Sequence, residues 1–258
     1  MTRLSKLSRS IRGKVAIVTG AASGMGRATA HLFADEGARV AVVDIVAEGV
    51  DRVVEEILQA GGEAVGFTVD VKSGDAITKL VDAVVDHFGG IDILVNNAGI
   101  SRLAPFDAAD YEASWQETFA VNLDAHVHLV RAALPHLEAS GAGRVVNIAS
   151  TEGVGAQRFA SAYSASKHGV IGLTRSMAVE LGRRGVTFNC ICPGPIETGM
   201  TAPIPDDAKA KFARRRVPLL RYGQPEEVAH ATLGFVLPAA SFTNGAVLLV
   251  DGGFSIQN

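Results

Sequence analysis

Cysteine is scarce in the 258-residue sequence, and its placement excludes several kinds of site. The two cysteines, Cys190 and Cys192, stand two residues apart in an apparent strand, where the geometry for a disulfide is poor. No third cysteine completes a metal-binding set, and the seven histidines form no HExxH motif. We therefore expect no disulfide and no metal site, and interpret both thiols as small buried apolar groups.

Excess charge and long apolar runs are also lacking. The net charge is -3, which gives no basic surface for nucleic acid. No apolar run reaches the roughly 18 to 20 residues that a membrane-spanning helix needs. The N-terminus is basic but has no apolar stretch behind it, so secretion is not indicated. A transit peptide is the alternative, but we favour a flexible basic tail over residues 1–13 and a cytoplasmic protein.

The sequence is rich in alternating apolar strands and amphipathic helices. The pattern predicts strands at 14–19, 38–45, 63–71, 91–99, 143–150, 185–194 and 246–253. Between them it predicts helices at 24–36, 50–60, 75–88, two within 110–137, 161–181, a short one within 195–217, and 226–237. Such alternation is typical of an α/β protein with a parallel sheet covered on both faces. We predict one domain over residues 14–258, with ligands at the carboxyl ends of the strands of a Rossmann-type, doubly wound, seven-stranded parallel sheet.

A glycine-rich turn follows the first predicted strand. Its sequence, TGAASGMG, contains Gly20, Gly24 and Gly26, which let backbone N–H groups and a helix N-terminus face a pyrophosphate. A plain strand-to-helix turn is the alternative. Asp44 ends the second strand, where a carboxylate can bind the ribose hydroxyls of an adenosine and repel a 2′-phosphate. No basic residue lies within the turn, so NAD is favoured over NADP.

Two further segments are candidates for cofactor contacts. Asp70, with Val71 beside it, could contact an adenine ring, although a turn-forming role for Asp70 is the alternative. The NNAG segment, Asn96 to Gly99, brings amide groups and small residues to the end of the fourth strand. Asn96 could instead bond the backbone of adjacent strands.

A tyrosine, a lysine and a serine form the candidate catalytic group. Tyr163 and Lys167 are four residues apart in a run of small residues, so they share one face of a helix. Ser150 ends the preceding strand. A phenol has a pKa of about 10, and a nearby ammonium favours its ionised form. Asn122, a polar residue in an apolar helix, could hold a water that links Lys167 to solvent, or could cap or kink the helix.

Together these segments resemble the short-chain dehydrogenase/reductase family. The resemblance rests on TGAASGMG, NNAG, Asn122, Ser150, YSASK and PGPIET, in that order over nearly the whole chain. It implies that Ser150 polarises the substrate oxygen, Tyr163 is the general acid/base, Lys167 lowers the pKa of Tyr163 and binds ribose, and Asn122 completes a proton relay. Ala149 departs from a serine that many members have there, but Ser150 keeps the catalytic spacing.

Turn, strand ends and resemblance together give a set of expected cofactor contacts. These are Gly20, Ser23, Gly24, Met25, Gly26, Asp44, Ile45, Asp70, Val71, Asn97, Ala98, Gly99, Tyr163, Lys167, Pro193, Gly194, Ile196 and Thr198. The substrate pocket is expected where the sequence is least regular, with a closing lid at about 195–217. Its candidate residues are Arg102, Leu103, Glu152, Gln157, Phe159, Met200 and Ile204.

These observations predict an NAD-dependent oxidoreductase that interconverts a secondary alcohol and a ketone. An NADPH-dependent 3-oxoacyl-thioester reductase and a non-enzymatic NAD-binding sensor are the alternatives. Arg214 to Arg216 raise the question of an anionic thioester substrate, but such charge runs are usually solvated. The resemblance implies a homotetramer, whereas the residues alone support only self-association.

Overall fold

The computed structural model describes residues 4–257, and Arg3 of the basic leader lies outside them. Seven parallel strands form one sheet in the order β3-β2-β1-β4-β5-β6-β7. Their bounds are β1 Val15–Thr19, β2 Arg39–Asp44, β3 Glu63–Thr68, β4 Ile93–Asn96, β5 Arg144–Ile148, β6 Thr187–Pro193 and β7 Val247–Val250. The predicted fold class is confirmed, including the reversal of strand order between β1 and β4 at which such sheets bind ligands.

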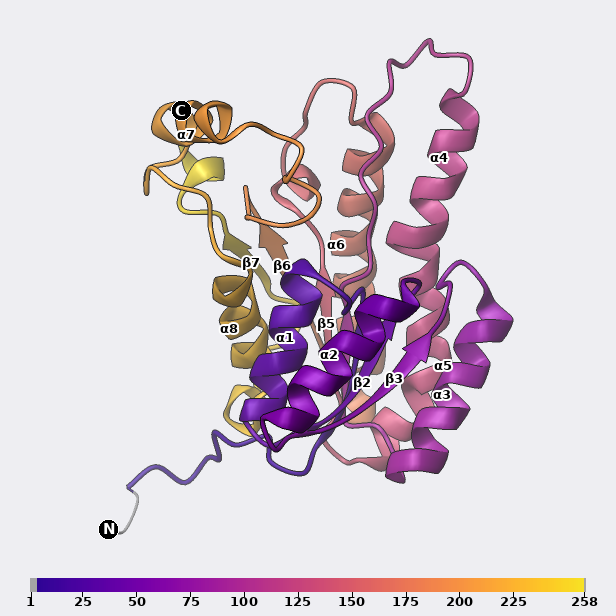
Figure 1. The fold of residues 1–258 in the computed structure, drawn as a ribbon. Helices are drawn as coiled ribbons and strands as arrows, with labels where there is room; N and C mark the ends of the chain where they lie inside the picture. Colours follow the sequence, from indigo (N-terminus) through magenta and orange to yellow (C-terminus); the bar gives the residue numbers. More distant parts are fainter. Residues whose placement is uncertain (1–3, 258) are drawn as a thin grey trace.

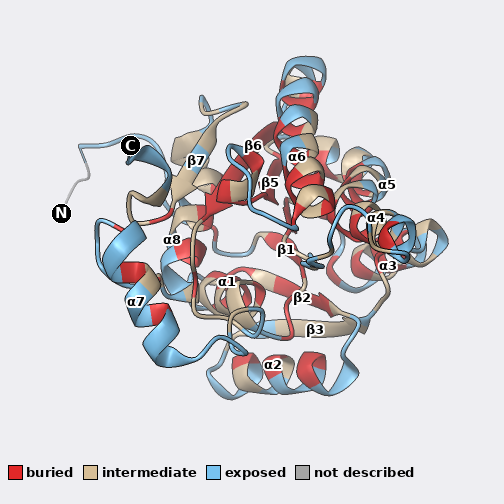
Figure 2. Cartoon of the chain, turned by 90° about the horizontal axis from the view of Figure 1, so that it is seen from above, coloured by how far each residue is buried: buried red, intermediate tan, exposed pale blue. Residues whose placement is uncertain are grey.

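Helices cover both faces of the sheet (Figure 2). Helices α1 (Gly24–Asp35), α2 (Ala47–Gln59) and α8 (Pro225–Val236) lie on one face. Helices α3 (Gly74–Phe88), α5 (Ala125–Ala139) and α6 (Ser161–Leu181) lie on the other. Helix α4 (Tyr111–Phe119) packs beside α6, and α7 (Asp206–Arg216) extends beyond the end of the sheet.

Alternating side chains of the strands supply the two cores. In β1, Val15 and Ile17 belong to the cluster with α3, α5 and α6, whereas Ala16 and Val18 belong to the cluster with α1, α2 and α8. Successive side chains of a strand point to opposite faces, so a strand buried on both faces is apolar at every position. This is why the strands read as continuous apolar runs.

Strand register brings the functional segments to one edge. Thr19 pairs with Val43, Asn96 with Asn147, and Ile148 with Ile191. The segments after β1, β2, β4 and β5 therefore leave the sheet at the same level. Asn97 reinforces the join between two of them, since its Nδ2 donates to the Thr19 and Gly20 carbonyl oxygens at 2.8 and 3.1 Å.

The region predicted to hold two helices is one continuous helical run with a π-helical segment, Ala120–Asp124, between α4 and α5. Asn122 lies in this segment and is fully buried. π-Helical turns are frequent at functional sites, and the water-holding, capping and kink roles of Asn122 stay predictions. Near the N-terminus, Ile11 is also fully buried and the Ala239 N–H donates to the Ser8 carbonyl oxygen, so packing starts before Lys14.

Within residues 4–257, no helix combines the length and apolar character required to cross a membrane.

Candidate active site

A cleft of about 620 Å³ opens at the carboxyl ends of the strands. It runs from the glycine turn after β1, past the segment after β4, to the end of β5, the start of α6 and the loop after β6. Ser150, Tyr163 and Lys167 all line it, together with Asp44 and residues of the glycine turn. Side chains far apart in the sequence are therefore brought to one cavity.

Ser150 lies two residues after the end of β5, with an extended backbone, and caps a short 3₁₀ turn, Thr151–Gly153. Its Oγ accepts a hydrogen bond of 3.1 Å from the Glu152 N–H, which leaves the hydroxyl proton for another acceptor. Tyr163 follows on the first turn of α6 and interacts with this hydroxyl. The serine can therefore donate to an oxygen placed beside the phenol.

Lys167 is buried one turn further along α6, only 3% exposed. Its Nζ donates to the Ile148 carbonyl oxygen at 2.8 Å and lies 5.7 Å from the centre of the Tyr163 ring. Burial lowers the pKa of Lys167 to about 8, while the neighbouring Cys190 and Cys192 thiols act in the opposite direction. The ammonium group is held between the end of β5 and the helix that carries Tyr163.

Asn122 is joined to the same cluster through the segment after β4. Its Nδ2 donates to the Ile100 carbonyl oxygen at 2.9 Å, and its Oδ1 accepts from the Ile100 N–H at 2.9 Å. A Cβ atom built on Gly99 would lie 3.4 Å from Asn122 Oδ1 and 3.5 Å from Lys167 Nζ. Asn122 and Lys167 thus flank the same glycine, although Asn122 does not itself line the cleft.

The electrostatics of Tyr163 differ from the expectation. Burial raises the pKa of Tyr163, and the nearby Glu152 raises it further, whereas the Ser150 hydroxyl lowers it. Burial, the largest of these influences, sets the direction. In the protein by itself, the phenol therefore stays protonated near neutral pH.

The nucleotide end of the cleft fits a dinucleotide. Gly20 and Gly24 have positive φ angles of 65° and 55°, which favour glycine. A Cβ on Gly26 would lie only 2.1 Å from the Gly20 carbonyl oxygen, so the turn requires glycine there too. Asp44 is fixed by the Ala22 and Val46 N–H groups at 3.0 and 3.1 Å. With the N-terminus of α1 facing the cavity, these features suit a pyrophosphate and an adenosine ribose.

Most of the expected cofactor contacts lie in the cleft, but four do not. Gly26, Ile45, Asp70 and Val71 are outside its lining. Asp70 is not at a strand end, because β3 ends at Thr68, and its Oδ1 accepts from the Lys72 N–H at 3.0 Å. That is the turn-forming alternative. Asn96 is structural as well, since its Nδ2 donates to Asn147 Oδ1 at 2.8 Å.

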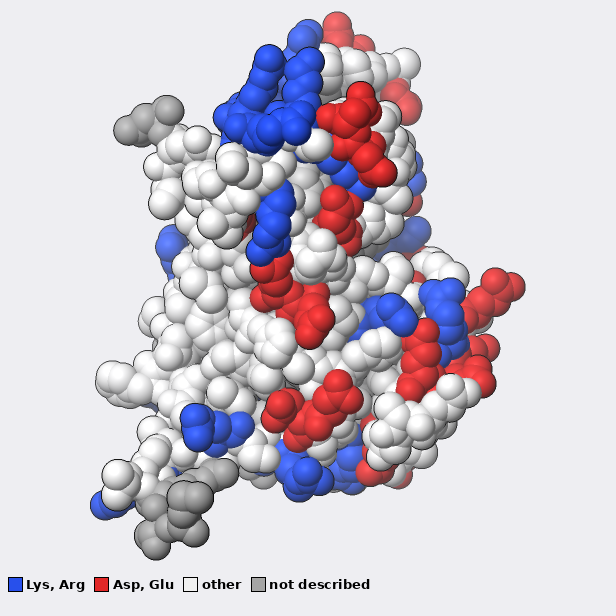
Figure 3. All heavy atoms as spheres, turned by 60° about the vertical axis from the view of Figure 1, so that its left-hand side comes forward, with Lys and Arg blue, Asp and Glu red and all other residues white. Residues whose placement is uncertain are grey.

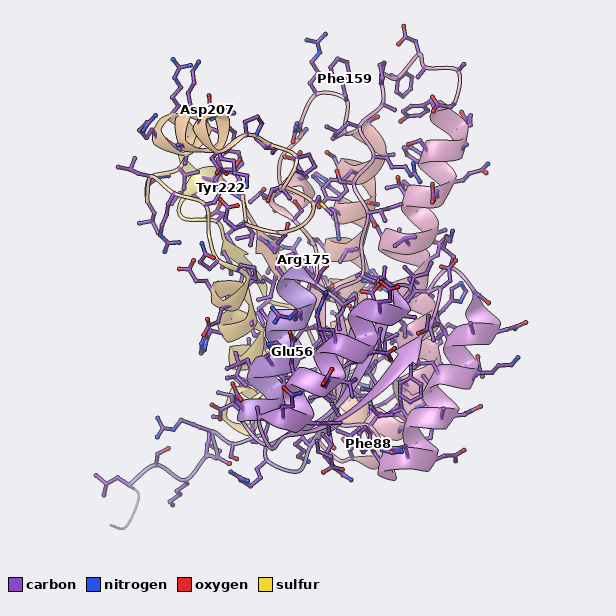
Figure 4. All side chains as sticks on the ribbon, in the orientation of Figure 1. Glu56, Phe88, Phe159, Arg175, Asp207 and Tyr222 are labelled. Atoms are coloured by element: carbon purple, nitrogen blue, oxygen red, sulfur yellow. The ribbon has the colours of Figure 1, made fainter. Side chains whose placement is uncertain are left out.

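Of the expected substrate contacts, Arg102 and Met200 line the cleft. Glu152 is half-buried and accepts from the Ser164 hydroxyl at 3.2 Å, whereas Leu103, Gln157, Phe159 and Ile204 are exposed outside the lining. Figure 4 shows Phe159 at the tip of the loop before α6. Sequence reasoning missed several lining residues in irregular loops or beside named ones: Ile100, Ser101, Ile148, Ala149, Gly199 and Thr201.

The remaining candidates for chemistry are buried or solvated. Cys190 and Cys192 are free and fully buried, as expected. No group of three or more metal-binding side chains occurs among the described residues. Arg214, Arg215 and Arg216 are exposed on the last turn of α7, outside the cleft lining, and acidic side chains lie near this basic patch (Figure 3).

Comparison with known proteins decides the family. Residues 20–255 match the protein family described as enoyl-(acyl carrier protein) reductase. The chain is 42% identical over 243 residues to cis-4-hydroxycyclohexanecarboxylate dehydrogenase of Sinomonas cyclohexanicum, which covers 94% of this chain and 96% of that protein. The chain is a short-chain dehydrogenase/reductase.

Other relatives agree over the full length of the enzyme. The 3-oxoacyl-[acyl-carrier-protein] reductase of Thermotoga maritima is 39% identical, over 95% of this chain and 99% of that one. A structure of 7α-hydroxysteroid dehydrogenase with NADH and 7-oxo glycochenodeoxycholic acid superposes with a TM-score of 0.93 at 33% identity, covering 99% of each chain. The enzyme is an oxidoreductase of alcohol or ketone substrates that uses NAD(P).

The burial of Lys167 predicts a pH-dependent contribution to stability. Its pKa is about 8 in the folded protein and about 10.4 in an unfolded chain. Between these values the unfolded state binds more protons, so the lysine disfavours folding below pH 8 and this penalty fades as the pH rises to about 10. We expect the unfolding free energy of wild type, relative to that of Lys167→Met, to increase as the pH rises from about 8 to about 10. Urea denaturation measures both values. A difference that is constant with pH, or that moves the other way, contradicts the assignment.

Proposed function

We propose that the enzyme is an NAD(H)-dependent oxidoreductase that interconverts a secondary alcohol and a ketone by hydride transfer, with Tyr163 as the general acid/base. The observation that carries this proposal is the presence of Ser150, Tyr163 and Lys167 in one cleft with the glycine turn and Asp44. The proposal includes a cytoplasmic homotetramer, as the family resemblance implies, and light scattering tests the subunit number.

The side chains have complementary roles in alcohol oxidation. The Ser150 hydroxyl donates to the substrate oxygen and holds it beside Tyr163. The phenol first loses its own proton toward Lys167 and solvent, and the resulting phenolate oxygen takes the alcohol proton. An oxidised nicotinamide held in the cleft by the glycine turn and Asp44 would supply a hydride acceptor and a positively charged ring. That charge is needed because burial leaves the pKa of Tyr163 raised in the protein alone. In ketone reduction the same phenol returns the proton.

Lys167 and Asn122 have supporting roles on the side of Tyr163 away from the substrate. The Lys167 ammonium group, bonded to the Ile148 carbonyl oxygen, stabilises negative charge on the phenol side of the site and is positioned to bind a ribose hydroxyl. The Asn122 side chain bonds the Ile100 backbone at 2.9 Å, and its Nδ2 also donates to the Ser166 Oγ at 3.2 Å, so it supports the relay by fixing the segment after β4 against α6. A side-chain amide supplies both the donor and the acceptor that the Ile100 backbone uses, next to Gly99.

The preference for NAD rests on the charges around the adenosine ribose. Asp44 lines the cleft and is fixed by two backbone N–H groups. Arg27, the first basic residue after the turn, is engaged by Glu56 through two bonds of 2.9 and 2.8 Å. A 2′-phosphate would therefore meet a fixed carboxylate and no free guanidinium from Arg27.

A 3-oxoacyl-thioester reductase is the second candidate, favoured by relatives such as the Thermotoga maritima enzyme. An NADPH-dependent reductase of this kind would place the 2′-phosphate of NADPH beside Asp44. A non-enzymatic sensor is disfavoured because all three reactive side chains share the cleft with the cofactor features.

A substrate screen with a catalytic variant tests the proposed chemistry. Ring and chain secondary alcohols are assayed with NAD and NADP, and ketones and 3-oxoacyl thioesters with the reduced cofactors, by nicotinamide absorbance. We expect turnover of alcohols with NAD, and a loss of at least about 10²- to 10⁴-fold in Tyr163→Phe because the variant has no general acid/base. Tyr222→Phe, outside the cleft lining, is the matched control. Equal rates in wild type and Tyr163→Phe would exclude the assigned role, and turnover confined to thioesters would favour the second candidate.

Substitution of Asp44 tests the cofactor preference. Asp44→Ser removes the charge that repels a 2′-phosphate, while Arg52 still bonds the Ala22 carbonyl oxygen at 3.1 Å nearby. We expect kcat/KM with NAD to fall by about 10-fold or more, as hydrogen bonds to a charged group are lost, and the NADP-to-NAD ratio to rise. An unchanged ratio, or a wild type that already prefers NADP, contradicts the proposal.

A further inference from the structure

One charged side chain in the cleft has no part in the proposed reaction. Among the described residues that line the cleft, the charged ones are Asp44, Arg102 and Lys167. Asp44 is at the nucleotide end, and Lys167 is engaged with the Ile148 carbonyl oxygen beside Tyr163. Arg102 is thus the lining cation that neither cofactor binding nor proton transfer uses.

Arg102 is mounted on a segment that is fixed at both ends. At Ile100, the backbone N–H and carbonyl oxygen both bond the Asn122 side chain at 2.9 Å. At Ala104, the N–H donates to the Phe159 carbonyl oxygen at 2.9 Å. This stretch follows β4 and rises beside α6 (Figure 1). Arg102 lies midway between these two bonded positions, so the course of its backbone along the cleft is fixed.

The guanidinium group of Arg102 already binds a carboxylate, and it does so weakly. Its Nη2 lies 2.5 Å from Glu117 Oε2, and the two side chains are 52% and 36% exposed. Ion pairs this exposed contribute little to stability. The other guanidinium nitrogens make no hydrogen bond or ion pair within the described part of the chain. The guanidinium group can therefore donate to a second carboxylate, or release Glu117 and bind that carboxylate instead, with little loss of stability.

We propose that Arg102 binds a carboxylate of the substrate, so that the enzyme acts on secondary alcohols and ketones that also carry a carboxylate. This inference rests on the proposed function. The planar guanidinium fork matches a carboxylate with two parallel hydrogen bonds, and Ser101 beside it in the lining can add a hydroxyl donor. The anion is a small one inside the cleft, because the exposed Arg214, Arg215 and Arg216 lie outside the lining.

Hydroxycarboxylates and their amides provide the test. The probes are 4-hydroxycyclohexanecarboxylate, 3-hydroxycyclohexanecarboxylate and 4-hydroxypentanoate, each compared with its primary amide at equal concentrations of NAD. The readout is the acid-to-amide ratio of kcat/KM, which cancels general damage to the site. We expect wild type to favour the acids, and Arg102→Gln to lower the ratio by about 10- to 100-fold, as for the loss of charged hydrogen bonds. Arg102→Lys keeps the charge but cannot form two parallel hydrogen bonds, so its acid-to-amide ratio should lie between those of wild type and Arg102→Gln.

Glu117→Gln gives the opposite sign and is the sharpest part of the test. It removes the internal competitor for Arg102, so the acid-to-amide ratio should rise through a lower KM for the acids. A purely structural Arg102–Glu117 pair would make both variants fail alike. Arg158→Gln, an exposed arginine outside the cleft lining, is the matched control and should leave the ratio unchanged.

Calorimetric binding of cyclohexanecarboxylate and its amide to the full chain separates this inference from the proposed function. Preferential binding of the carboxylate in wild type, lost in Arg102→Gln, supports the anion site. Turnover of neutral secondary alcohols with no preference for acids, and equal binding of both ligands, overturns the anion site and leaves the proposed function standing. Carboxylate binding without turnover of any alcohol or ketone overturns the proposed function and keeps the site.

Discussion

The active site depends on one buried charge, the ammonium group of Lys167. The group is 3% exposed and is held by the Ile148 carbonyl oxygen at 2.8 Å. Burial of an ammonium group is costly, and its pKa falls to about 8 as a result. The surrounding structure accommodates that cost: β5 ends so that the Ile148 carbonyl oxygen accepts from the amine, and α6 holds Tyr163 one turn away. The position of the charge determines which groups can ionise beside it.

The same charge affects the groups around it. His126, on α5, is 1% exposed, and neither of its ring nitrogens has a hydrogen-bond partner among the described residues. Burial and the Lys167 charge lower the pKa of His126 to about 3, so this imidazole stays neutral. Lys167 and His126 are therefore not both charged in this region near neutral pH.

The regular parts of the structure could be predicted from the sequence because local patterns determine them. Apolar strands, with glycine after several of the helices, predict the sheet. A spacing of four residues on a helix brings Tyr163 and Lys167 together. The rest depends on contacts between distant segments. The bonds between Asn122 and Ile100 join segments 22 residues apart, and the raised pKa of Tyr163 comes from burial. The Arg102–Glu117 pair joins the segment after β4 to α4. The strand predicted over residues 63–71 ends at Thr68, because Asp70 begins a turn in which its side chain accepts from the Lys72 N–H.

The two ends of the cleft use fixed charges on different supports. Asp44 is at a strand end, where the backbone N–H of Ala22 in the glycine turn and that of Val46, directly before α2, donate to its carboxylate. Arg102 is on a loop, fixed through Asn122 and Phe159. A rigid sheet edge suits the shared cofactor chemistry, whereas loops can vary with the substrate.

The most direct test of this account is the pKa of Tyr163 itself, followed by ¹³C NMR of protein labelled at tyrosine Cζ. The chain has three tyrosines, so Tyr163→Phe assigns the resonance. The account predicts a pKa above the ordinary value of about 10 in the protein alone and a clear fall when NAD binds. A pKa already below 10 without NAD would mean that Lys167 is sufficient to activate the phenol, and a pKa unmoved by NAD would contradict the proposed acid/base role.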